Sequence, residues 1–175
     1  MSKDMTRKIL ADPQVKKVTM NDLYLLMSEI LESGGSFSLT ITGSSMFPFI
    51  LGGRDQVTLS PIMQPLKKYD LPLYRRRDGM FVLHRIVRVE KDGSYTCCGD
   101  HQWTLEKGLQ EDQMIAIATT FVRKGKKITN ANILYRMYRV FWTWILPLRP
   151  YLFDLHTKWR NVKKLVYRKI RHGEK

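Results

Sequence analysis

Two adjacent serines lie in a short, mostly apolar turn that reads GSSMFPFI over residues 43–50. A serine hydroxyl is a weak nucleophile unless a nearby base removes its proton, so a catalytic serine must be held close to that base. Glycine and serine are also ordinary turn residues. The turn therefore has two interpretations: it is a plain connection, or it supports a nucleophile. The second interpretation requires a residue elsewhere in the chain that can act as the base.

Four histidines could supply that base. His156 and His172 lie in a strongly charged segment, where solvated side chains are expected. His101 lies in an expected loop, whereas His84 lies among apolar residues in the stretch FVLHRIV. A single histidine in a strand is more often structural than catalytic. His84 is therefore evidence for catalysis only in combination with other motifs.

Residue patterns predict a mainly β body that carries these candidates. Residues 36–42 alternate apolar and hydroxyl side chains, and residues 55–61 form a second strand-like run. Two Asp-Gly turns divide residues 71–100 into three strand-like runs, and residues 114–128 predict a strand, a glycine turn and a short strand. An amphipathic helix is expected before this body, over residues 19–35.

Three motifs follow one another along this body: GSSMFP at 43–48, VLHRIV at 82–87 and CGD at 98–100. Together they resemble the serine peptidases of the signal peptidase I clan, which also includes the LexA-type self-cleaving repressors. The resemblance covers about residues 36–128. It implies a signal peptidase/LexA-like β-fold for this catalytic core, and the residue patterns add an N-terminal helix before it and amphipathic helices after it.

The resemblance also implies roles for individual residues. The serine before the methionine is the nucleophile of the clan, which makes Ser45 the nucleophile and not Ser44. His84 stands where bacterial signal peptidase I has lysine, and where endoplasmic-reticulum-type and archaeal signal peptidases have histidine. An imidazole is a suitable base because its pKa starts near neutrality. For the acid that orients this base, Asp100 is preferred and Glu106 is the substitute.

The position two residues before the nucleophile bears on how the oxyanion is bound. Some bacterial signal peptidases have a serine there, and this chain has Gly43. The oxyanion would then depend on the backbone N–H of Ser45, helped by the Ser44 hydroxyl. No cofactor and no metal is expected for this chemistry.

Positive charge is concentrated in the C-terminal part of the chain. The formal net charge is +14 over 175 residues. Residues 123–175 contain 15 Lys and Arg and 2 acidic residues, whereas residues 1–122 contain 15 Lys and Arg and 14 acidic residues. This asymmetry indicates a polyanionic partner for the C-terminal segment.

The basic segment, residues 129–175, predicts two amphipathic helices and contains three tryptophans. The apolar positions at helical spacing are Ile133, Met137, Phe141 and Trp144 in the first helix, and Leu152, Leu155, Trp159, Val162 and Val166 in the second. Such a helix suits an anionic membrane surface, and we expect this partner for residues 130–175. Packing on the β body or binding an acidic leader peptide are alternatives, and nucleic acid is the least favoured. The expected organisation is an N-terminal segment, a catalytic domain and a helical arm, over residues 1–35, 36–128 and 129–175.

Membrane-spanning segments are not expected. The longest uncharged run of the arm, residues 140–148, has nine residues, whereas a spanning helix needs about 20. The N-terminal sequence lacks the apolar stretch of a signal peptide. Cys97 and Cys98 are adjacent, and neighbouring cysteines rarely bridge. These features favour a cytoplasmic protein, or one bound peripherally to the cytoplasmic membrane.

The expected function is that of a serine endopeptidase that removes a signal or leader segment from a precursor by Ser-His catalysis, through an acyl-enzyme. One alternative is a LexA-like self-cleaving regulator. The roughly 35 residues before the β body leave little room for the DNA-binding domain that this alternative requires. The other alternative is a catalytically silent module that binds a peptide.

Overall fold

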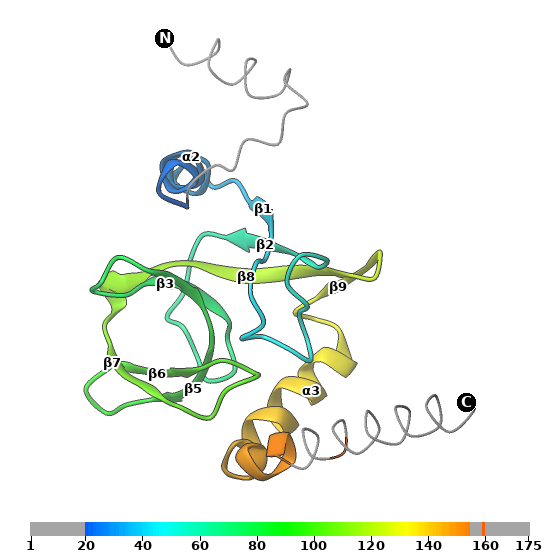
Figure 1. Ribbon diagram of the computed structural model, residues 1–175. Helices are drawn as coiled ribbons and strands as arrows, with labels where there is room; N and C mark the ends of the chain where they lie inside the picture. Colours follow the sequence, from blue (N-terminus) through cyan, green and yellow to red (C-terminus); the bar gives the residue numbers. More distant parts are fainter. Residues whose placement is uncertain (1–19, 155–158, 160–175) are drawn as a thin grey trace, which may run out of the picture.

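Two antiparallel sheets form a mainly β body, as the sequence predicts. The computed structural model describes residues 20–154 and 159. The larger sheet has the order β1-β2-β8-β3-β4 with β9 paired to β8, and the smaller has the order β5-β6-β7. The larger sheet curls into a half-barrel, and the smaller sheet lies across from β3 and β8 (Figure 1). The strands are β1 (Phe37–Thr40), β2 (Gln56–Ser60), β3 (Pro72–Arg75), β4 (Phe81–Leu83), β5 (Arg85–Val89), β6 (Tyr95–Cys98), β7 (Glu106–Leu109), β8 (Met114–Arg123) and β9 (Lys126–Thr129).

A few short helices complete the described chain. The helix expected over residues 19–35 is present as α2, and it ends before Gly34, whose φ of 79° is typical of a helix C-terminus. The α2 and α3 helices lie at opposite ends of the β body (Figure 1). The helical elements are α2 (Met20–Glu32), α3 (Ile133–Trp144) and the 3₁₀ turns η1 (Glu111–Gln113) and η2 (Leu146–Leu148), followed by helical residues 149–154.

The strand-like run around His84 is divided between the two sheets. β4 ends at Leu83 and pairs with β3 in the larger sheet, whereas β5 begins at Arg85 and pairs with β6 in the smaller sheet. His84 is the single residue between them, so its side chain, which is 2% exposed, lies where the two sheets meet. The sequence predicts one continuous strand here, and the structure replaces it with a corner.

Two apolar clusters fix the arrangement of these elements. The first joins α2, the serine turn, the larger sheet and the start of α3, through residues that include Met27, Met46, Phe49, Phe121 and Tyr135. The second fills the space between the two sheets, through Leu66, Tyr74, Ile86, Tyr95, Cys97 and Leu109. Met46, next to Ser45, belongs to the first cluster, and Cys97, which pairs with Glu106 across β6 and β7, belongs to the second.

Within residues 20–154, no helix is both long enough and apolar enough to cross a bilayer. Of the second helix expected for the arm, Leu152 lies in the helical residues 149–154, whereas Leu155, Val162 and Val166 lie outside the described residues. Trp159 is described, and 55% of its surface is exposed.

Candidate active site

The turn that carries Ser45 is anchored at its ends and in the core. Gly43 has a φ of 87°, and a Cβ on Gly52 would overlap the Gly43 carbonyl, so two loop segments pass backbone to backbone. Met46 is 2% exposed and belongs to the first apolar cluster. The Phe47 N–H donates to the Ser44 carbonyl at 3.0 Å, which closes the turn. These contacts hold the backbone of the turn in place on both sides of Ser45.

Gly99 brings the Ser45 backbone next to the His84 ring. A Cβ added to Gly99 would lie 2.7 Å from the Ser45 carbonyl oxygen and 3.0 Å from His84 Nε2. Both atoms therefore border the space that the missing side chain leaves. The His101 N–H donates to the same Ser45 carbonyl at 2.7 Å and so ties the CGD loop to the serine turn. The structure thus brings together the three motifs that are distant in the sequence.

Glu106, at the start of β7, is the acid that contacts the His84 ring. Its Oε1 lies 2.9 Å from His84 Nδ1, and its carboxylate also accepts two hydrogen bonds from the Arg76 guanidinium, at 2.5 and 2.6 Å. Burial alone would raise the pKa of the Glu106 carboxyl, but the hydrogen bonds from His84 and Arg76 outweigh it and lower that pKa to about 2. Glu106 is therefore ionised near neutral pH.

An ionised Glu106 determines which nitrogen of His84 carries the proton. A carboxylate only accepts hydrogen bonds, so Nδ1 must donate, and the neutral ring then has its lone pair on Nε2. The Tyr74 hydroxyl lies 3.4 Å from Nδ1, and burial raises the pKa of Tyr74 well above its ordinary value. The Nε2 atom faces the gap at Gly99. This is the tautomer that a general base needs.

Asp100 does not contact the His84 ring, which corrects the expectation that its carboxylate reaches the imidazole. The carboxylate accepts hydrogen bonds from Arg85 at 2.8 and 2.9 Å and from the Tyr138 hydroxyl at 3.0 Å. Asp100 and Arg85 are both fully buried. The reason lies in β5 and β6: Arg85 pairs across the sheet with Cys98, two residues before Asp100, and its guanidinium takes the carboxylate that the sequence assigns to the histidine.

Hydrogen-bond donors remain available beside Ser45. Among the described residues, neither the Ser45 N–H nor the Ser44 hydroxyl donates to a protein acceptor, and the Ser45 hydroxyl has no protein partner either. Gly43 contributes no side chain, as the sequence indicates. The arrangement can therefore offer an N–H to an oxyanion that forms next to Ser45.

The two cysteines near this site are buried. Cys97 and Cys98 are buried free thiols, and burial raises their pKa values to about 12 and about 11, so both stay protonated near neutrality. No group of three or more His, Cys, Asp and Glu side chains that could hold a metal ion occurs in the described part of the chain.

A cavity opens beside the Glu106 carboxylate. Its volume is about 240 Å³, and it is lined by Arg76, His101, Gln102, Trp103, Thr104 and Glu106. Trp103 is 53% exposed at its rim.

The Glu106→Gln substitution is expected to destabilise the protein in a pH-dependent way. Because the Glu106 pKa is lowered from 4.5 to about 2, the ionised carboxylate stabilises the folded state above pH 4.5, and this contribution is lost as the pH falls toward 2. Urea unfolding should show the variant less stable than wild type at about pH 7, with a gap that narrows between about pH 5 and 3. An equal gap at every pH would contradict the proposed ion pairing, and Glu29→Gln, at an exposed position on α2, provides the control.

Sequence reasoning missed part of this arrangement. The roles of Arg76 and Tyr74 were not expected, and neither was β7, whose sequence EKGL lacks β-branched and aromatic residues. The only signal for Arg76 was the basic run before the Asp-Gly turn at residues 78–79.

In comparisons with known proteins, no family model matches the chain and no curated protein sequence matches it.

Proposed function

We propose that the chain is a serine endopeptidase of the signal peptidase I-like type, in the subgroup that uses a histidine base. It removes a signal or leader segment from a precursor protein or peptide. The observation that carries the proposal is the proximity of three groups: the ionised Glu106 carboxylate lies 2.9 Å from His84 Nδ1, and His84 Nε2 and the Ser45 backbone carbonyl both border the gap at Gly99. An acid, a base and a serine in this order are the elements of a catalytic triad.

The proposed reaction proceeds through an acyl-enzyme. His84 Nε2 takes the proton of the Ser45 hydroxyl as Oγ attacks the scissile carbonyl carbon, and the carbonyl oxygen becomes an oxyanion beside the Ser45 N–H. The protonated imidazole then gives its proton to the leaving amine as the C–N bond breaks. In the second half, His84 takes a proton from water, the resulting hydroxide attacks the ester, and Ser45 leaves with its proton restored.

Each remaining residue of the site has a supporting role in this scheme. Glu106 holds the His84 ring in the required tautomer and stabilises the imidazolium that forms during each step. Arg76 orients the Glu106 carboxylate. By the resemblance to signal peptidases, the substrate would be an extended segment laid along a strand edge with small residues next to the cut.

The curled half-barrel is compatible with the finer fold proposal, a signal peptidase/LexA-like catalytic core. The serine turn, His84 and the CGD loop come together around Gly99, and His84 lies where the larger and the smaller sheet meet. The support comes from the order of the three motifs and from their convergence around Gly99.

Glu106→Gln tests the assignment of the orienting acid. The variant is expected to lower kcat by about two to four orders of magnitude with little change in KM, because the amide can hold the wrong tautomer of His84. Cleavage of a library of short peptides with small residues before the scissile bond, followed by mass spectrometry, provides the assay. The exposed Asp112→Asn variant is the matched control and should keep wild-type kinetics. A Glu106→Gln enzyme with normal kcat would remove Glu106 from the mechanism.

A further inference from the structure

The α3 helix has two distinct sides, and one of them is docked on the β body. Tyr135 accepts a hydrogen bond from Arg85, and the Tyr138 hydroxyl donates to the Asp100 carboxylate. The Trp142 indole N–H donates to the Asp100 carbonyl at 2.8 Å. Of the alternatives for the arm, packing on the body is thus what the structure shows for this side of α3.

The opposite side of α3 is apolar and faces solvent. Its residues are between 45% and 75% exposed: Ile133, Leu134, Met137, Val140, Phe141 and Trp144. With 3.6 residues per turn, these positions fall within an arc of about 120°, and the docked side chains lie on the other half of the helix. The sequence correctly groups Ile133, Met137, Phe141 and Trp144 on one face, and the structure turns that face away from the core.

Apolar side chains are also exposed past the end of α3. Leu148 and Tyr151 are 53% and 75% exposed, and Leu152 is 44% exposed. Exposed apolar residues scattered singly need no explanation, but a helix that presents six of them on one face indicates a surface that becomes covered.

Positive charge is concentrated in the part of the sequence that contains the apolar face. Arg136 is exposed on α3 itself, and Lys124, Lys126 and Lys127 are exposed in the β8–β9 hairpin just before it in the chain. Residues 123–175 contain 15 Lys and Arg against 2 acidic residues. The cover for this face must therefore offer both an apolar phase and negative charge.

We propose that the outward face of α3 binds the surface of an anionic lipid bilayer, with its apolar side chains at the level of the headgroups and the basic residues against the lipid phosphates. A bilayer supplies both required chemistries at once. A second copy of the chain would bring two charges of +14 together, and nucleic acid offers no apolar phase for Met137, Phe141 and Trp144.

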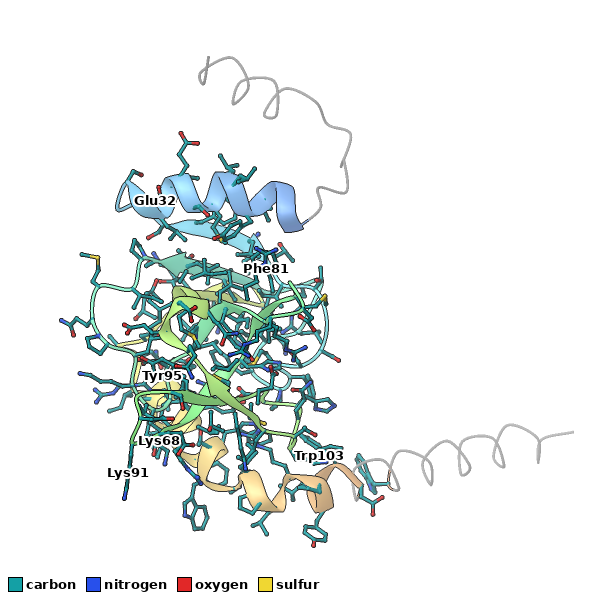
Figure 2. The ribbon with its side chains drawn as sticks, turned by 90° about the vertical axis from the view of Figure 1, so that its left-hand side faces the viewer. Glu32, Lys68, Phe81, Lys91, Tyr95 and Trp103 are labelled. Atoms are coloured by element: carbon teal, nitrogen blue, oxygen red, sulfur yellow. The ribbon has the colours of Figure 1, made fainter. Side chains whose placement is uncertain are left out.

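The helical segment that follows α3, residues 149–154, contacts both α3 and the candidate active site. Arg149, which is fully buried, donates to the Gly99 carbonyl at 2.8 Å. Phe153 lies 4.5 Å from the His101 ring and 5.9 Å from Trp103 between ring centroids. Figure 2 shows Trp103 beside the C-terminal helical segment. If the proposed peptidase function holds, on which this step rests, the substrate is a precursor presented at the membrane surface.

Vesicle co-sedimentation of the full-length Ser45→Ala protein tests the membrane proposal without reference to catalysis. Vesicles of phosphatidylcholine with about one-third phosphatidylglycerol should pellet the protein, and pure phosphatidylcholine should bind it much more weakly. The Phe141→Ser/Trp144→Ser variant should bind the anionic vesicles about tenfold or more weakly, because two large apolar side chains no longer enter the interface. High salt should weaken wild-type binding without abolishing it.

Leu25→Ser/Met63→Ser is the matched control, because Leu25 and Met63 are 73% and 85% exposed but lie outside α3. It should bind like the parent protein. Equal pelleting of the Phe141→Ser/Trp144→Ser variant, or complete loss of parent binding in high salt, would overturn the proposal. So would a dimer that this variant dissociates, since a second copy would then cover the face. A normal melting temperature of the variant shows that any lost binding is not caused by unfolding.

Discussion

Replacing Ser45 or His84 by alanine is expected to remove nearly all peptide cleavage, by about four to six orders of magnitude in kcat. The physical reason is that the serine hydroxyl is nucleophilic only while the imidazole can take its proton. The Ser45→Ala/His84→Ala double variant should therefore be little worse than either single variant, because the pair fails as a unit. Peptide turnover measured by mass spectrometry gives all three rates.

Ser44→Ala is the matched control for this prediction. It changes the neighbouring hydroxyl in the same turn and should cost much less, because the Ser44 side chain only assists the oxyanion in our scheme. If Ser44→Ala were inactive while Ser45→Ala still cut peptides, the nucleophile would be Ser44. If the loss of kcat in the double variant equalled the product of the losses in Ser45→Ala and His84→Ala, the two residues would act separately.

Asp100→Asn is expected to destabilise the fold by about 3–5 kcal/mol, the usual cost of breaking a buried ion pair. Burial works against the charged Arg85 guanidinium, but the Asp100 carboxylate outweighs it and raises the pKa of Arg85 above its ordinary value. Without that carboxylate, a fully buried positive charge has no counter-ion. Thermal unfolding should show a Tm lower by about 10 °C or more.

The control for Asp100→Asn is the apolar double variant Asp100→Leu/Arg85→Met, which removes both charges. It should be less destabilised than the sum of its single variants, because neither charge is left unpaired. A stable Asp100→Asn protein that had lost cleavage would contradict this assignment and would place Asp100 in catalysis, as the sequence suggests.

The helix α2, the strand alternation and the two Asp-Gly turns could be predicted because local residue patterns determine them. Gly79 and Gly93 have φ values of 86° and 85°, which the Asp-Gly pairs indicate directly. The division of the run around His84 between two sheets could not be predicted, because it depends on how distant strands pair. The same holds for the outward-facing apolar side of α3: periodicity identifies a face but not what covers it.

At the candidate site, the sequence nominates Ser45 and His84, and the structure places the Ser45 backbone next to the His84 ring, but the sequence does not show which acid contacts the histidine. Judged from their positions in the sequence, either Asp100 or Glu106 could contact the His84 ring. The choice depends on Arg85, whose buried guanidinium pairs with Asp100, and on the β6–β7 pairing, which places Glu106 opposite Cys97. Which carboxylate pairs with Arg85 and which with His84 depends on the tertiary structure, and residue spacing alone does not show it.

The central claim, that His84 activates Ser45, is tested most directly by reacting the intact protein with a fluorophosphonate probe and locating the adduct by peptide mass spectrometry. We predict a single adduct on Ser45 in the wild-type protein, much slower labelling in His84→Ala, and wild-type labelling in Asp112→Asn. This result would also exclude a catalytically silent peptide-binding module. No labelling of a folded wild-type protein, or an adduct on Ser44 with Ser45 unmodified, would contradict the claim.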